Sequence, residues 1–189
     1  MKNRSTLVYS LLVMLMAGIS GRVVAQDTQT DNHQVTVVVP VVALLDLETS
    51  DTENLTATFT KPANDEAGNK IVAPTAISTT WLNYTTIQAG TTTKKVNVKA
   101  SGVVDGVDIQ LVAATASATG AGTKGTPAGT ITLSTTDQTL ISGIGSAYTA
   151  SGASSGHQLT YSFVADDANY ASLRSDETTI TVTYTLADN

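Results

Sequence analysis

Three glycines in the sequence have a spacing that nucleotide-binding sites use. Gly120, Gly122 and Gly125 match the pattern G-x-G-x-x-G, which binds a pyrophosphate where a strand leads into the N-terminus of a helix. Here Pro127 and Gly129 follow and lead into a predicted strand, so no helix starts after the glycines. We therefore interpret this segment as a flexible loop.

A second motif, Gly152-Ala-Ser154-Ser-Gly156, matches the nucleophile elbow of hydrolases and is followed directly by His157. The elbow needs a strand-to-helix turn in an alternating α/β sheet, and this sequence shows no such alternation. A histidine next to a serine in the chain also rarely reaches its hydroxyl with catalytic geometry. We assign no catalytic residue, and we expect the protein not to be an enzyme.

Metal ligands are scarce, because the chain has two histidines, His33 and His157, and no cysteine. A zinc site needs more nitrogen or sulfur ligands than these, so we expect both histidines to be solvated at the starts of strands. Carboxylates cluster in three places: Asp51 with Glu53, Asp105 with Asp108, and Asp166 with Asp167. Calcium accepts such oxygen ligands, and it is the one cofactor that the sequence leaves open. We favour turn formation, since aspartate commonly closes turns through its own side chain.

Aromatic residues provide the one cue to a ligand-binding face. Trp81 and Tyr84 lie close together in Thr80-Trp-Leu-Asn-Tyr84, and exposed aromatic rings combine a large apolar surface with a polar edge. Two interpretations stay open: the pair stacks on a sugar ring, or the single Trp packs in the core. We favour core packing and keep a carbohydrate-binding or adhesin module as the alternative function.

The elements that would position these residues begin after an export signal. Lys2 and Arg4 precede an apolar stretch, Leu7–Ile19, and Val23-Val-Ala25 presents small residues before Gln26. This is the layout of a secretory signal peptide cleaved after Ala25. We expect residues 1–25 to be removed, the protein to be secreted or at the cell surface, and no membrane insertion after cleavage.

The mature chain would have 164 of the 189 residues, a length that suits one domain. Cleavage removes three of the ten basic residues and none of the 16 acidic ones, so the net charge falls from −6 to −9. Such a surface repels phosphate backbones, so we expect no nucleic-acid partner. Without cysteine, the core and the strand hydrogen bonds must supply all the stability of an exported protein.

Periodicity predicts an all-β domain at 35–189 after a flexible polar lead-in at 26–34. Alternating apolar residues and β-branched residues predict eight strands, at 35–47, 55–59, 76–83, 94–100, 107–116, 130–134, 158–164 and 178–186. Loops are expected at 61–70, 117–129 and 142–157, and one short helical turn at 166–173, capped by Asp166 or Asp167. Seven to nine such strands predict an antiparallel β-sandwich, immunoglobulin-like or pilin-like.

The layout of the mature chain resembles that of pilin-type secreted domains of bacteria, the chaperone–usher pilins and related spore-coat-type sandwiches. A signal peptide precedes a polar linker and an alternating apolar segment, Val35-Thr-Val-Val-Val39, and the sequence closes on the strand Thr181–Leu186. The resemblance implies that an N-terminal strand of one subunit completes the sandwich of the next. The chain departs from many such pilins in having no disulfide and in the interruption by Pro40.

The expected function is that of a non-enzymatic extracellular structural protein, a cell-surface fibre or matrix subunit. Residues 35–47 would assemble it by β-strand addition, with Val35, Val37 and Val39 filling pockets of the partner. The expected partners are other copies of the chain, other surface proteins or glycans.

Overall fold

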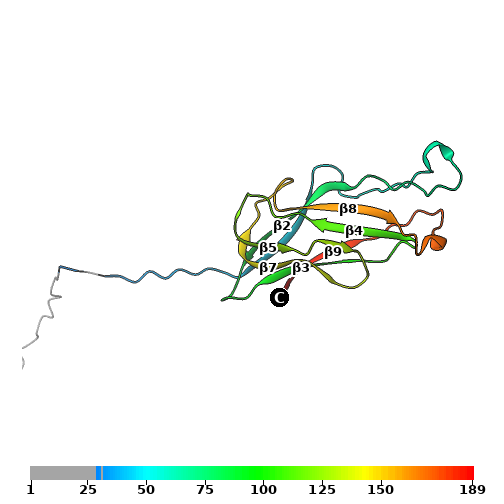
Figure 1. Ribbon diagram of the computed structural model, residues 1–189. Helices are drawn as coiled ribbons and strands as arrows, with labels where there is room; N and C mark the ends of the chain where they lie inside the picture. The colour runs from blue at the N-terminus through cyan, green and yellow to red at the C-terminus, as the bar shows by residue number, and fades with distance from the viewer. Residues whose placement is uncertain (1–28, 31) are drawn as a thin grey trace, which may run out of the picture. The chain divides into compact units, whose positions relative to one another are not determined.

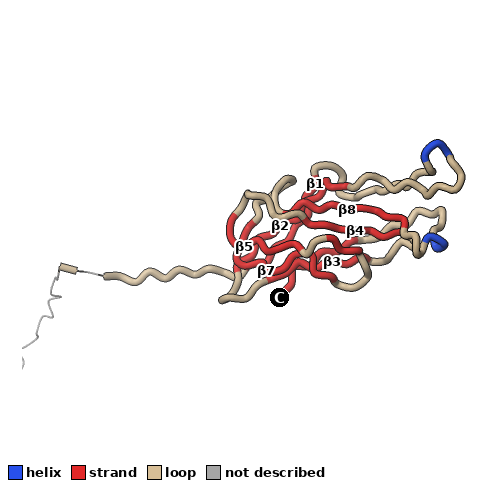
Figure 2. The backbone as a smooth tube through the Cα atoms, in the orientation of Figure 1, coloured by secondary structure: helices blue, strands red, loops and turns tan. Residues whose placement is uncertain are grey.

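The computed structural model describes residues 29, 30 and 32–189. The predicted signal peptide and residues 26–28 and 31 of the predicted lead-in lie outside the described residues. The described part of the chain contains nine strands and two short 3-10 helices (Figures 1 and 2). The strands are β1 (Val42–Thr49), β2 (Ile77–Ile87), β3 (Lys94–Ala100), β4 (Val107–Ala113), β5 (Ala121–Pro127), β6 (Thr130–Thr132), β7 (Gln138–Tyr148), β8 (His157–Ala165) and β9 (Val182–Asp188). The helices are η1 (Ala63–Asp65) and η2 (Tyr170–Ser172). The protein is therefore all-β, as its sequence predicts.

The strands form one antiparallel sheet in the order β6-β4-β8-β2-β7-β3-β9, with β1 added to β2 and β5 added to β7. Strand β2 is the hub of this sheet. All of β1 pairs along one of its edges. The opposite edge pairs with β8 up to Leu82 and then with β7 at Thr85 and Thr86. One strand thus joins two groups of strands, β6-β4-β8 and β7-β3-β9.

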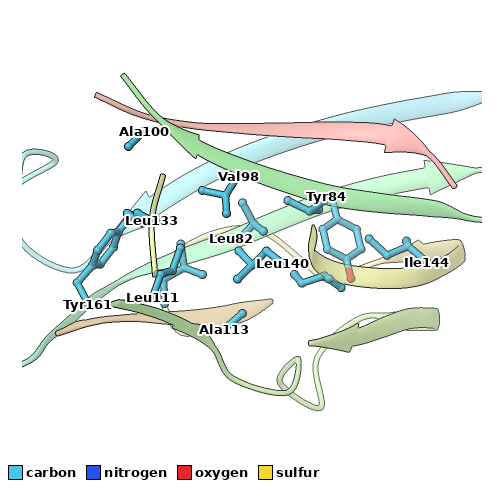
Figure 3. Packing of buried hydrophobic residues seen from close by; sticks show 13 residues of the cluster. Leu82, Tyr84, Val98, Ala100, Leu111, Ala113, Leu133, Leu140, Ile144 and Tyr161 are labelled. Carbon is cyan, nitrogen blue, oxygen red and sulfur yellow. The ribbon is translucent and has the colours of Figure 1, made fainter. Parts of the chain in front are cut away.

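A single apolar core holds these strands together (Figure 3). Its largest fully buried aliphatic residues come from β2, β3, β4, β7 and β8: Leu82, Val96, Val98, Leu111, Leu140, Ile141, Ile144 and Leu159. Burying one such side chain contributes about 1.5–3 kcal/mol. Because the chain has no cysteine, this cluster and the strand hydrogen bonds take the place of disulfides.

Alternation in the sequence identifies several strands closely. Strand β3 has the predicted bounds, and Val96 and Val98 are buried while Lys99 is exposed. Strand β8 extends the predicted 158–164 by one residue at each end. Strand β9 begins later than the predicted 178 but keeps its pattern, with Val182, Tyr184 and Leu186 packed against the core. The predicted helical turn at 166–173 contains η2, whose N-cap residue is Asn169 rather than either aspartate.

One predicted strand and two predicted loops in the body of the domain are wrong. Residues 55–59 form no strand, and the only ladder contact near them is an isolated bridge between Thr60 and Val72 in the described chain. The segments 117–129 and 142–157, expected to be loops, contain all of β5 and much of β7.

Glycines explain why β5 was not predicted. Gly122 has a φ of 88°, and a Cβ atom built there would lie 2.1 Å from the carbonyl oxygen of Ser146 on β7. A side chain would prevent this approach, so the two backbones can pair only because the residue is glycine. Glycine spacing that mimics a nucleotide-binding motif therefore belongs to a strand–strand contact.

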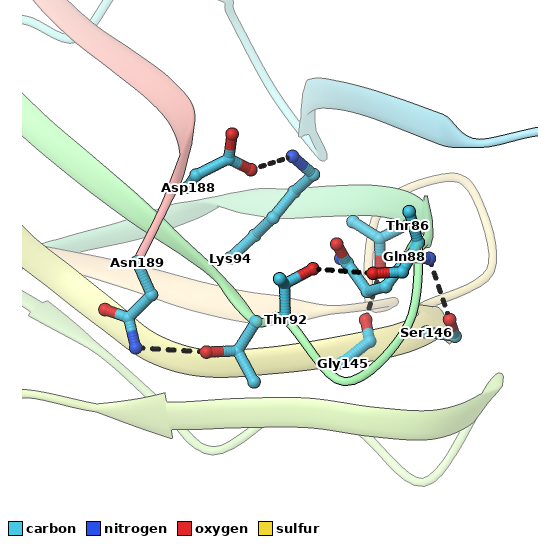
Figure 4. A network of polar contacts seen from close by, with 10 residues as sticks. Thr86, Gln88, Thr92, Lys94, Gly145, Ser146, Asp188 and Asn189 are labelled. Carbon is cyan, nitrogen blue, oxygen red and sulfur yellow. Dashed lines mark hydrogen bonds and ion pairs between the residues drawn. The ribbon is translucent and has the colours of Figure 1, made fainter.

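The end of β9 is fixed to its neighbour β3 (Figure 4). Lys94 forms an ion pair with Asp188, and the backbone N–H and side-chain amide of Asn189 both donate to Thr93 at 3.0 Å. Seven consecutive residue pairs join the two strands without a register shift. Strand β9 is therefore held along its whole length on the β3 side.

Candidate assembly site

The valine segment predicted to mediate assembly divides into two parts. Residues 32–41 are exposed and belong to no strand, and they include Val35, Val37 and Val39. Residues 42–49 form β1, which pairs with residues 80–87 of β2 in the same chain. The predicted strand 35–47 is therefore wrong in its first half. Its boundary follows Pro40, which has no N–H to give to a ladder.

The face of β1 that points toward the core is incompletely covered. Residues directly opposite in an antiparallel pair point to the same face, so Leu45 and Leu47 share the face of Tyr84 and Leu82, their partners on β2. Leu82 is fully buried and Tyr84 is 3% exposed, whereas Leu47 is 45% exposed. Core-facing apolar surface on β1 thus remains in contact with water.

A groove lies where this surface meets β9. Leu45 and Leu47 line it from β1, and Val182 and Tyr184 line it from β9, with a cavity volume of about 390 Å³. Val182 and Tyr184 are on the core-facing side of β9, since their partners on β3 are the buried Ala100 and Val98. The walls of the groove are therefore core-facing residues of two strands that do not pair with each other.

Two acidic side chains also line this groove. Asp46 and Glu53 line it beside the four apolar residues and Thr183. The hydroxyl of Tyr184 is turned inward and hydrogen-bonds the hydroxyl of Tyr161 on β8. Burial raises the pKa of both phenols, so they stay neutral.

Both strands beside the groove have a free edge. Among the described strands, β1 pairs only with β2, and β9 pairs only with β3. Free N–H and C=O groups on such edges can accept a further strand. The groove residues were not identified by sequence reasoning. The available signal was that the run from Val41 to Leu47 contains more apolar residues than one strand face can bury.

The structure does not bring Trp81 and Tyr84 to a common face. Residues three apart in a strand point to opposite sides. Tyr84 is buried, donates its hydroxyl to the carbonyl of Lys124 and lies 2.9 Å from Nε2 of His157. Trp81 is half-buried on the other face, between Glu48 and Gln158 on the flanking strands. The predicted ligand face of two exposed aromatics is therefore wrong.

The prediction that His157 is solvated is also wrong, since its side chain is fully buried. Its Nδ1 donates to the carbonyl of Ala114 at 2.8 Å, and its Nε2 faces Tyr84 and the carbonyl of Lys124. Burial lowers the pKa of this imidazole. Both nitrogens thus face groups other than Ser154, so the serine and histidine of the elbow motif do not form a catalytic pair. His33 is exposed, as predicted.

Three of the carboxylates considered as calcium ligands lie around one cavity. Asp105, Asp108 and Asp166 line a cavity of about 270 Å³. Asp166 accepts hydrogen bonds from the backbone of Ala168 and the side chain of Asn169, which is turn chemistry. In the part of the chain that the structure describes, no three acidic or histidine side chains are placed to hold a metal ion.

No protein-family model, curated protein or solved structure matches this chain. The helices among the described residues are too short to cross a membrane.

Proposed function

We propose that this chain is a non-enzymatic, extracellular structural protein, a subunit of a cell-surface fibre or matrix. It assembles by β-strand addition, and residues 35–41 are the strand that is added to a partner. The observation that carries the proposal is a run of exposed valines that form no strand within the described chain: Val35, Val37, Val38, Val39 and Val41.

An isolated protein that leaves these valines in water does not gain the free energy that their burial would contribute. Each fully buried Val would contribute about 1.5–3 kcal/mol, and β-branched residues favour the extended backbone of a strand. Val35, Val37 and Val39 would point to one face of that strand, and the residues between them to the other. Pairing with a sheet edge satisfies both the backbone and one valine face, which is how strand addition obtains affinity and specificity.

The proposal includes a sandwich arrangement of the strands. It is supported by the hydrogen bond between Tyr161 of β8 and Tyr184 of β9. Three strands, β2, β7 and β3, separate β8 from β9 in the sheet order. Strands β8 and β7 pair with successive parts of the same edge of β2 and extend away from each other along it, so a flat sheet would place Tyr161 and Tyr184 far apart. Contact between their side chains supports a sheet that folds over on itself.

Light scattering on two forms of the chain tests this function. One form begins at Gln26 and the other lacks residues 26–40, so that it keeps all of β1. We expect the first to form polydisperse oligomers and the second to be a folded monomer. If both forms have the same monomeric mass, assembly through residues 35–41 is contradicted.

Two substitutions in the longer form provide a matched control. Val37 and Val38 are 77% and 84% exposed and point to opposite faces of the proposed strand. Val37→Asp would place a charge against the partner's apolar surface and should give monomers. Val38→Asp would face water and should leave assembly intact. Equal effects of the two variants would argue against an added strand.

A further inference from the structure

We infer that strand β5 is a lid over one edge of β7, and that it opens in mildly acidic solution when His157 gains a proton. The inference does not depend on the proposed assembly, because it involves neither the valine segment nor the groove between β1 and β9. It assigns to the fold a pH-sensitive switch that controls access to a sheet edge.

Strand β5 has few attachments to the rest of the domain. Among the described strands it pairs only with β7, and this pairing shifts register between Gly122 and Lys124. The apolar core cluster contains no residue of β5. Segments with few buried apolar contacts open at a lower free energy than the rest of a protein. Strand β5 can therefore open while the core stays packed.

One backbone carbonyl connects β5 to side chains of two other strands. The carbonyl oxygen of Lys124 accepts a hydrogen bond from the Tyr84 hydroxyl of β2, and it lies 3.2 Å from Nε2 of His157 on β8. The hydroxyl and Nε2 are 2.9 Å apart, so the three groups meet at one point. The other ring nitrogen, Nδ1, donates to the carbonyl of Ala114 at 2.8 Å. Lifting β5 would remove one of the three groups and let water reach the imidazole.

A proton on His157 would create a buried charge beside another positive charge. The side chain is fully buried, and the groups that contact its ring are two backbone carbonyls and a phenol. The ammonium group of Lys124 donates to the carbonyls of Ser117 and Thr119 and opposes the proton from nearby. Burial and this like charge lower the pKa of His157, although the two carbonyls facing its ring favour the cation. Because a buried charge without a counter-ion is costly and a hydrated one is not, protonation favours the opened strand.

The other ionisable groups around His157 were considered element by element. The Tyr84 phenol stays neutral, since burial raises its pKa. Segments 114–119 and 149–156 contain no ionisable residue. Tyr148, the single ionisable residue of β7, is 51% exposed. Within the described chain the switch therefore depends on the imidazole and the nearby ammonium group.

Opening of β5 would expose a sheet edge that is covered in neutral solution. Strand β5 pairs with β7 from Ile141 to Tyr148, while the opposite edge of β7 pairs with β2 and β3. Free N–H and C=O groups on an uncovered edge can pair with another strand. The protonated form would therefore present a binding edge that the neutral form lacks.

Hydrogen exchange of the chain from Gln26, measured by mass spectrometry between pH 7.5 and 5.5, tests this lid. Protection factors, which correct for the intrinsic effect of pH on exchange, are compared for β5 and β3. We expect β5 to be at least tenfold less protected than β3, because it opens without the core. Its protection should also fall with pH, starting near about 6.5, the ordinary pKa of a hydrated histidine. For one proton the fall is at most about tenfold per pH unit.

Two variants and one internal control complete the test. His157→Gln should abolish the fall in β5 protection, and His33→Gln should leave it, since His33 is exposed. If His157→Gln does not fold, the bridge in which Thr60 and Val72 exchange hydrogen bonds is the control within the unmodified chain, and its protection should not change with pH. Equal protection of β5 and β3 would show that β5 opens only with the whole domain. That result, or β5 protection that does not change with pH, overturns the inference.

Discussion

Leu47 of β1 and Leu82 of β2 are directly paired and point to the same face of the sheet, yet Leu82 is fully buried and Leu47 is 45% exposed. The difference arises because β2 lies between β1 and β8, whereas β1 has one neighbour among the described strands. The exposure of these two leucines therefore shows that the core is closed around Leu82 on β2 and open beside Leu47 on β1.

Alanine substitutions at these two leucines should have unequal costs. Leu82→Ala should lower the free energy of unfolding by about 2–5 kcal/mol, as for other buried leucines. Leu47→Ala should cost about 1 kcal/mol or less in the form lacking residues 26–40, because much of its surface is already in water. Urea unfolding followed by circular dichroism measures both. Equal costs would mean that Leu47 is as enclosed in solution as Leu82.

The hydroxyl pair of Tyr161 and Tyr184 should behave as a coupled unit. Replacing either tyrosine by phenylalanine leaves the other buried hydroxyl without its partner, at a cost of about 1–3 kcal/mol. The double variant should cost less than the two single variants together, because it removes both polar groups. A double-mutant cycle in urea measures this coupling. Strict additivity would show that the hydroxyls do not meet in solution and would weaken the sandwich arrangement.

Regular alternation made part of this fold predictable from sequence. In β3 and β9 the apolar residues recur at every second position, and each strand presents its predicted face to the core. In these two strands the alternation in the sequence matches the burial of the side chains in the fold. Strand β5 was missed because its glycines leave no apolar pattern to detect, and the close approach of Gly122 to Ser146 is a property of two strands together.

Only the valine segment of the candidate assembly site could be predicted from the sequence. Val35, Val37 and Val39 stand out because they alternate and are apolar. The groove exists because, among the described strands, β1 has no second neighbour beside Leu47. The order of strands in the sheet determines this, and no local motif reveals it. Tyr84 was misassigned for a similar reason, since its burial depends on contacts with Lys124 and His157, 40 and 73 residues away in sequence.

Stability should fall in mildly acidic solution because of His157. Burial lowers its pKa in the folded chain, an effect that the nearby Lys124 reinforces and two backbone carbonyls oppose. In the unfolded chain the pKa is about 6.5. Between that value and the lowered one, the unfolded chain binds more protons, so stability decreases as pH falls through this window, by at most about 1.4 kcal/mol per pH unit.

Urea unfolding between pH 7.5 and 5.5 measures this dependence. His157→Gln should remove the slope, whereas His33→Gln should leave it, because His33 is exposed. A slope that persists unchanged in His157→Gln would assign the pH dependence to other groups.

Two glycines with nearly the same backbone conformation should respond differently to alanine. Gly122 and Gly129 have φ of 88° and 91°, so each substitution carries a strain of about 1–3 kcal/mol. Only at Gly122 would the new Cβ meet backbone, 2.1 Å from the carbonyl oxygen of Ser146, while nothing lies within 4 Å at Gly129. Gly122→Ala should therefore cost about 1–3 kcal/mol more than Gly129→Ala, the usual range for overpacking.

Urea unfolding of the two variants gives this difference, and hydrogen exchange of the β7 amides locates it. Faster exchange at Ala147, which pairs with Gly122, is expected in Gly122→Ala alone, because the added methyl group separates the two strands. Equal destabilisation by both substitutions, with β7 protection unchanged, would show that β5 does not approach β7 this closely in solution.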